Sequence, residues 1–157
     1  MEINFKAAMS CNYTFGRTKP IEYIVIHSDD TNISEISDFY SNNALTSSMH
    51  YLVGQGSIIQ SVADTDTAWH CGCKNYNHKH CRNANSIGVC ICSKGQNISK
   101  ASLNNVVKLV NYLLEKYNLT SDNVIRHSDV GGEKVCPNMS ESLWNDFKSK
   151  LKKKVNK

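Results

Sequence analysis

Three side chains that commonly bind metals stand out in this sequence. His27 ends an apolar run over residues 21–26, His127 follows a second short apolar segment, and Cys136 lies nine residues further on. Two imidazoles and one thiolate form a donor set that suits zinc. Three protein ligands leave one tetrahedral position for water, which is typical of a hydrolytic site. Spacing alone is weak evidence, because a lone histidine is more often an ordinary core or surface residue.

A second group of possible ligands is Cys71-Gly-Cys73 together with His78, His80 and Cys81. It allows three interpretations: a second, structural metal site, a redox-sensitive pair, or plain loop thiols. The group lacks the usual two-residue gap between paired cysteines of a metal site, so loop thiols are favoured. The chain has seven cysteines, and we expect them to be reduced rather than paired in a disulfide framework.

Short β-branched runs predict the strands that must position these residues. Residues 21–26 and 86–92 are predicted to form buried central strands. Residues 50–53 and 57–62 flank Gly54-Gln-Gly56, which predicts a hairpin. His27 would therefore lie at the C-terminal end of a buried strand.

Helical periodicity is clearest over residues 100–117, where apolar residues define one face and Ser99 is placed to cap the N-terminus. Residues 32–43 are predicted to form a shorter helix. A last helix is predicted to begin near Asn138 or Ser140. Its buried stripe would be Leu143, Trp144, Phe147 and Leu151.

Together these elements predict an α/β fold with a central mixed β-sheet flanked by helices. The length of 157 residues fits a single domain spanning residues 1–157, with a motif-bearing core over about 20–147. Residues 71–85 contain almost no apolar side chains and are predicted to form a long surface loop.

Charge and hydropathy narrow the classes of partner. The net charge is +4, but six lysines lie in the last ten residues, so the rest is near neutral and does not predict a nucleic-acid-binding face. The basic C-terminal tail (148–157) is interpreted as a solvated helix end, with contact to an anionic wall or membrane surface as the alternative. No apolar run is long enough to span a membrane. The first ten residues do not resemble a secretion signal, so we expect synthesis in the cytoplasm.

Six segments, in order, resemble one enzyme family. They are Ile24-Val-Ile-His27, Ser48-Met-His-Tyr-Leu-Val53, Ala68-Trp-His70, Asn85-Ser-Ile-Gly88, Arg126-His-Ser-Asp-Val130 and Lys134-Val-Cys-Pro137. Together they resemble the zinc-dependent N-acetylmuramoyl-L-alanine amidases of the peptidoglycan-recognition-protein superfamily, over about Pro20 to Trp144. The nearest variant is the small single-domain phage lysins, whose pattern Tyr76-Asn-His78 and Ser86-Ile-Gly-Val-Cys90 also follow.

The resemblance implies roles for six residues. The implied ligands of one zinc ion are His27, His127 and Cys136. Tyr51 matches a tyrosine whose hydroxyl faces the metal-bound water, Lys134 a lysine that stabilises the oxyanion, and His70 a residue lining the substrate groove. The implied reaction is hydrolysis of the amide bond between N-acetylmuramic acid and L-alanine in peptidoglycan. The implied fold, a mixed sheet with helices packed on it, agrees with the one predicted above.

Two departures from the family pattern are visible. The segment from His127 to Cys136 is one residue longer than usual, and the glycines in Gly131-Gly-Glu133 are expected to absorb it. Many relatives carry a glutamate general base after Ser-Ile-Gly, where this chain has Cys90. The lysin subgroup shares this cysteine. We therefore expect the base role to fall to Tyr51 or to the zinc-bound hydroxide itself.

Alternative functions follow from the same residues. The chain could be a non-catalytic peptidoglycan-binding module, although such relatives usually lose a zinc ligand. It could be a cytoplasmic amidase that recycles soluble muropeptides, rather than a phage or prophage endolysin that acts on the cell wall after release. A metal-stapled interaction domain would explain the cysteines but not the ordered segments around His27 and Cys136. We expect a monomer.

Overall fold

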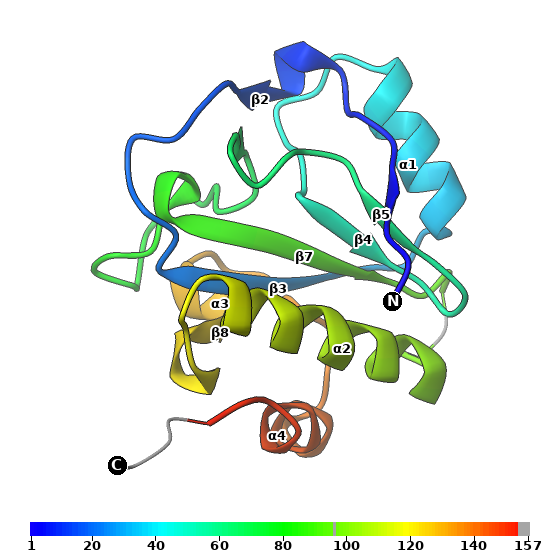
Figure 1. Cartoon of the computed structure of the whole chain (residues 1–157), viewed down its shortest axis with the longest axis vertical. Helices are drawn as coiled ribbons and strands as arrows, with labels where there is room; N and C mark the ends of the chain where they lie inside the picture. The colour runs from blue at the N-terminus through cyan, green and yellow to red at the C-terminus, as the bar shows by residue number, and fades with distance from the viewer. Residues whose placement is uncertain (96, 154–157) are drawn as a thin grey trace.

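A six-stranded mixed sheet lies at the centre of the molecule (Figure 1). The computed structural model describes residues 1–95 and 97–153. In spatial order the strands are β1 (Asn4–Phe5), β5 (Ile58–Gln60), β4 (Tyr51–Val53), β7 (Ser86–Cys92), β3 (Tyr23–Asp29) and β8 (Val124–Arg126). Strands β4, β7, β3 and β8 are parallel, and β5 is antiparallel to β4. The predicted mixed sheet and the predicted hairpin are confirmed.

Helices cover both faces of this sheet. The helices are α1 (Ile33–Asn42), α2 (Lys100–Lys116), α3 (His127–Val130) and α4 (Glu141–Ser149). Figure 1 shows α2 and α4 on one side of the sheet and α1 on the other. Ser99 caps α2 and Ser140 caps α4, each by accepting a hydrogen bond from a backbone amide of the first turn. Within the described residues, no helix is both long and apolar enough to cross a membrane.

The main core fills the space between the sheet and α2 and α4. Side chains of β3 alternate between the two faces, so Ile24 and Ile26 pack into this core while Val25 and His27 face the other side. Leu109, Val110 and the other inward residues of α2 have almost no exposed surface. Trp144, Phe147 and Leu151 add the predicted stripe from the C-terminal region, which confirms its amphipathic pattern.

A shorter antiparallel pair, β2 (Tyr13–Thr14) and β6 (Thr67–Ala68), lies beside the main sheet. The N-terminal segment that leads to it is part of the fold, which the sequence did not indicate. β1 extends the sheet by pairing with β5, and the Lys6 amide donates to the Gln60 carbonyl. Asn12 is fully buried, and its side-chain amide donates to the carbonyls of Tyr40 and Asn43 at the end of α1. The structured part of the chain therefore begins well before residue 20.

Two side chains at the start of the basic C-terminal tail pack against the body. The Lys148 ammonium donates to the carbonyls of Ser121 and Val124. Leu151 is 3% exposed, and the Lys152 backbone pairs with Ser121 and with the Asn111 side chain. Lys148 and Leu151 are therefore packed against the body, as the predicted stripe requires for Leu151, whereas the side chains of Ser149, Lys150 and Lys152 are exposed, in line with a solvated helix end. Residues 154–157 lie outside the described residues.

Removal of the Leu151 side chain should measurably destabilise the protein. We expect Leu151→Ala to lower the free energy of unfolding by about 2 kcal/mol, because it deletes a buried aliphatic side chain. The measurement is chemical denaturation followed by circular dichroism. Lys152→Ala is the matched control, since it shortens an exposed side chain and keeps the backbone hydrogen bonds. Equal stability of the two variants would contradict the packing described here.

Candidate metal centre

Parallel pairing of β3 with β8 brings the two predicted histidine ligands together. Ile26 of β3 lies opposite Arg126 of β8, so the residues that follow, His27 and His127, stand side by side. Their ring centroids are 4.7 Å apart. His127 is the first residue of α3, so its position is set by the point at which the strand ends and the helix begins.

Cys136 reaches the same place through the turn that follows α3. The Ser128 amide donates to the Cys136 carbonyl at 2.9 Å, and the Asn138 amide donates to the Ser28 hydroxyl at 2.7 Å. These bonds hold the turn against the end of β3. The Cys136 Sγ lies 3.8 Å from the Nδ1 of His27.

The three side chains fit the donor geometry of zinc. One nitrogen or sulfur atom of each of His27, His127 and Cys136 lies within 4.8 Å of the other two. Zinc–nitrogen bonds of about 2.0 Å and zinc–sulfur bonds of about 2.3 Å imply a tetrahedral N···S separation of about 3.5 Å. The observed 3.8 Å between Cys136 Sγ and His27 Nδ1 is close to this value. No other group of three such residues occurs in the part of the chain that the structure describes.

Burial adjusts the protonation of these ligands. Burial, and then the neighbouring His70 and His127 rings, lower the pKa of His27 well below its usual value. Burial also lowers the pKa of His127 and raises the pKa of the Cys136 thiol. Both imidazoles therefore favour the neutral form that binds a metal. A cation would in turn favour the thiolate of Cys136.

His70 lies behind the metal centre rather than on a groove wall. It is 4% exposed, and its Nδ1 is 3.1 Å from the Nε2 of His27. On the other side of the ring, Nε2 is 3.0 Å from the Ser86 hydroxyl. This burial corrects the prediction that His70 lines the substrate groove.

Tyr51 faces away from the metal centre, so the prediction that its hydroxyl faces a metal-bound water is wrong. Tyr51 packs in the core beneath α2, on the face of the sheet opposite His27. Its hydroxyl donates to Asp64 at 2.7 Å, and Lys116 of α2 forms an ion pair with the same carboxylate at 2.9 Å. Burial and the nearby Asp64 raise the pKa of Tyr51. Tyr51 is therefore a structural residue that joins β4 to α2.

Lys134 is exposed on the turn that leads to Cys136. Among the described residues, no hydrogen bond or ion pair involves its side chain. Gly131 and Gly132 precede it in the same turn, and each lies where a side chain would be unfavourable. A Cβ at Gly131 would lie 2.4 Å from the Asn75 carbonyl oxygen, and Gly132 has φ of +97°.

Cys90 lies on the same face of the sheet as His27, with which it is paired in register. It is buried beside Tyr40 and Leu52. A hydrogen bond with Cys92, and then burial, raise the pKa of Cys90 well above its usual value. A thiol that keeps its proton near neutral pH is not a general base, as expected from the sequence.

The loop over residues 71–85 lies on the surface, as predicted, and its backbone contacts α3. The amides of Asn77 and His78 both donate to the Val130 carbonyl. Cys71 and Cys81 have no exposed surface and cluster with Val25 and Val130. The favoured interpretation as plain loop thiols is therefore wrong for these two cysteines, which are core residues.

The same loop does not form the second metal site that the sequence allowed. The Nδ1 of His78 accepts hydrogen bonds from the amides of His80 and Cys81, so this nitrogen is already used. Within the described residues, the cysteines and histidines of the loop do not converge on one point.

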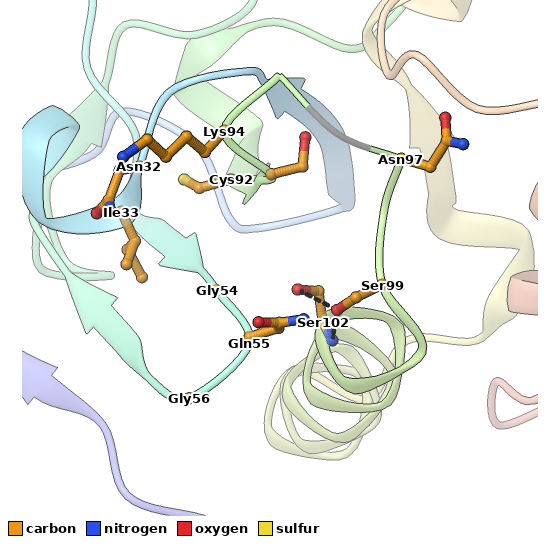
Figure 2. A pocket seen from close by; sticks show the side chains of 11 residues that line it. Asn32, Ile33, Gly54, Gln55, Gly56, Cys92, Lys94, Asn97, Ser99 and Ser102 are labelled. Atoms are coloured by element: carbon orange, nitrogen blue, oxygen red, sulfur yellow. Dashed lines mark hydrogen bonds between the residues drawn. The ribbon is translucent and has the colours of Figure 1, made fainter.

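Two pockets lie at opposite ends of β7, and neither is lined by a candidate ligand. A pocket of about 310 Å³ lies between the N-termini of α1 and α2 and the turn Gly54–Gly56 (Figure 2). It is polar, contains the Ser99 cap, and includes none of the three candidate ligands. A second pocket, of about 490 Å³, lies beside the loop that packs against α3. Its wall includes Phe15, Trp69, Tyr76 and Arg82.

Comparison with known proteins places the chain in a family. Residues 17–139 match the family model for N-acetylmuramoyl-L-alanine amidase. The chain belongs to this family. The matched residues of this chain include all three candidate ligands described above.

Two curated relatives come from Bacillus subtilis (strain 168). The N-acetylmuramoyl-L-alanine amidase CwlA is 34% identical over 143 residues, which is 87% of this chain and 51% of CwlA. The N-acetylmuramoyl-L-alanine amidase XlyB is 30% identical over 140 residues, which is 86% of this chain and 43% of XlyB. The chain therefore spans about half the length of the curated relatives it matches.

Solved structures show that the family fold is retained. PlyL superposes with a TM-score of 0.80 and 28% identity, covering 100% of both chains. The PlyG catalytic domain superposes with a TM-score of 0.79 and 27% identity, covering 96% of this chain and 93% of that one. The predicted fold class is confirmed by these neighbours.

The structure assigns Tyr51 to stability, and this can be tested. We expect Tyr51→Phe to lower the free energy of unfolding by about 1 kcal/mol, because Asp64 loses one of its hydrogen bonds. Urea denaturation would measure the loss, with Tyr112→Phe, an exposed tyrosine on α2, as the control. Hydrolytic activity of the folded variant should stay close to wild type. A large loss of activity at unchanged stability would contradict this assignment.

Proposed function

We propose that this chain is a zinc-dependent N-acetylmuramoyl-L-alanine amidase. It would hydrolyse the amide bond between the lactyl group of N-acetylmuramic acid and L-alanine in bacterial peptidoglycan. The observation that carries the proposal is the convergence of His27, His127 and Cys136 in a chain that belongs to the amidase family. The names of CwlA and XlyB support the same reaction.

The proposed centre holds one zinc ion through these three side chains. Zinc bound in this way supplies a Lewis acid and makes a coordinated water acidic enough to react near neutral pH. Three protein ligands, from β3, α3 and the following turn, would leave a fourth coordination position for water, which suits hydrolysis. The half-buried Cys136 and His127 mark the open side.

Lys134 is the proposed stabiliser of negative charge that develops on the scissile carbonyl oxygen. It lies two residues before Cys136, is exposed, and has a flexible side chain with three donors. One well-placed donor of this kind contributes about 3–4 kcal/mol to transition-state stabilisation. With Tyr51 and Cys90 excluded by position and protonation, the chain supplies no second side chain from the predicted set.

The pocket lined by Phe15, Trp69 and Tyr76 is the proposed contact surface for the substrate. Trp69 directly precedes His70, and Tyr76 pairs through its backbone with Gly131 at the end of α3. The Arg82 guanidinium lies 3.7 Å above the Tyr76 ring and holds that ring in place. Exposed aromatic rings of this kind suit the apolar faces of sugar rings.

We further propose that the chain acts as an endolysin on the cell wall rather than on soluble muropeptides in the cytoplasm. The resemblance of its sequence to small phage lysins supports this choice. Rates of stem-peptide release from intact walls and from soluble muropeptides distinguish the endolysin role from the recycling role. Release that is fast only from soluble muropeptides would favour the recycling role.

The proposed reaction predicts release of stem peptides that begin with L-alanine from purified cell wall. A chelator should abolish the release and added zinc should restore it. Lys134→Ala should retain zinc but lose at least ~100-fold in kcat, because an oxyanion donor is removed. Lys108→Ala, an exposed lysine of α2, is the control.

Two outcomes would contradict this picture. Binding to the wall without release of peptides would identify a binding module instead of an enzyme. Near-normal turnover of Lys134→Ala would remove this lysine from the site, while leaving the metal centre intact.

The metal ligands themselves can be tested by zinc content. We expect the wild type to bind about one zinc per chain and Cys136→Ser to lose most of its affinity, together with some stability. Metal analysis after dialysis gives the zinc content. Cys11→Ser is the control, because Cys11 is an exposed cysteine that is not a candidate ligand. Full zinc retention by Cys136→Ser would refute the ligand assignment.

A further inference from the structure

His70 forms the middle of a hydrogen-bonded chain that ends at a candidate metal ligand. From the inside outwards the chain runs from the Arg82 carbonyl to the Ser86 hydroxyl, then to His70 and His27. The separations are 2.7, 3.0 and 3.1 Å in that order. All three side chains in it are buried, so water does not compete for these bonds.

The direction of each bond in this chain follows from its inner end. A carbonyl oxygen has no proton, so the Ser86 hydroxyl donates to Arg82 and uses its only proton there. Ser86 must then accept from the Nε2–H of His70. A neutral His70 protonated at Nε2 has a bare Nδ1, which accepts from the Nε2–H of His27. His27 is left with its lone pair on Nδ1, the nitrogen that faces Cys136.

We propose that His70 is a positioning residue that holds His27 in the one tautomer able to bind the metal through Nδ1. The proposal rests on the proposed function, since it concerns the same zinc centre. It replaces the groove-lining role predicted from the sequence. The hydrogen-bond partner of a metal-bound imidazole sets both the tautomer and the orientation of its ring.

The sheet is built to accommodate this ring. A Cβ at position 88 would lie 2.6 Å from the Cγ of His70, so Gly88 is the residue that leaves room for the imidazole. The backbone amides of His70 and Cys71 both donate to the Asn83 side chain, which fixes the backbone beneath the ring. The glycine of the Ser-Ile-Gly segment is therefore explained by close approach of His70.

The Cys71 thiol lies next to the hydrogen-bonded series of Ser86, His70 and His27 but does not link its members. Its Sγ lies 3.5 Å from the Ser86 hydroxyl and 3.5 Å from the Nδ1 of His70. A hydrogen bond with Cys81 lowers the pKa of the Cys71 thiol, so its sulfur can also accept a hydrogen bond. Cys71→Ala therefore tests whether this sulfur, rather than His27, fixes the tautomer of His70.

Zinc affinity, measured by competition with a chromogenic chelator, tests the proposal without any activity assay. We expect His70→Phe to bind zinc about 10–100-fold more weakly, because the ring shape is kept and the acceptor for His27 is lost. His70→Asn places an amide oxygen near the position of Nδ1 and should recover most of the affinity. Cys71→Ala should bind zinc within about twofold of wild type. Thermal melts of the zinc-free variants check folding.

The tautomers can also be read directly in the zinc-free wild type by long-range proton–nitrogen NMR. The expected result is a proton on Nε2 of both His70 and His27. A proton on Nδ1 of His70, or a folded His70→Phe that keeps wild-type affinity, would overturn the inference. If His70→Phe does not fold, the NMR result decides. If the wild type binds zinc and His70→Phe binds it with the same affinity, only this inference is contradicted. If the wild type binds no zinc, the proposed centre itself is contradicted.

Discussion

The placement of β3 between two parallel neighbours constrains the rest of the structure. All seven residues of β3 pair with β7, and three also pair with β8. Because the backbone is held on both sides, the alternation of its side chains is fixed. Ile24 and Ile26 must enter the core beneath α2, and His27 must emerge on the other face, 3% exposed. Burial then keeps the imidazole neutral and leaves its two nitrogens to specific partners.

In the neighbouring strands, the same alternation places some side chains in the main core and others on the face of the candidate site. On β4, Tyr51 belongs to the core face, where its hydroxyl and Lys116 share the buried Asp64 carboxylate. A buried carboxylate is tolerated only when it is paired, so this network ties α2 to the sheet. On β7, Ser86, Gly88 and Cys90 face the other side, with His27. One face of the sheet therefore holds the main core, and the other holds the candidate site.

The loop over residues 71–85 forms the flank of that site, although its composition is that of a solvent-exposed segment. Its backbone donates to the Val130 carbonyl, and the Gly72 carbonyl lies 3.3 Å from the Nε2 of His127. Two buried cysteines replace the aliphatic side chains that usually secure such a loop. Close approach requires glycine at position 131, where any side chain would strike the loop. The loop thus supports His127 through its backbone, and His70, which directly precedes the loop, contacts His27.

Local patterns in the sequence were sufficient for the elements and for the identity of the metal-binding candidates. Helical periodicity in α2 and α4, β-branched runs in β3 and β7, and the Gly54–Gly56 turn are signals carried by neighbouring residues, so they can be read without a fold. The resemblance of the ordered segments added the roles of His27, His127 and Cys136. The N-terminal strand β1 was missed because two residues are too few to show a period.

Only the tertiary structure decided where the remaining side chains point. Tyr51 and His50 are adjacent in sequence and lie on opposite faces, a distinction that depends on the register of β4 against β7. His70 follows a tryptophan in a surface-like segment, yet it is buried because Gly88, on a strand distant in sequence, leaves space for its ring. Within the lysine-rich end, Leu151 is buried because it meets the core beneath α2, while Lys150 and Lys152 stay exposed. Composition and spacing along the chain record which groups are present, whereas their direction and burial depend on contacts between residues far apart in sequence.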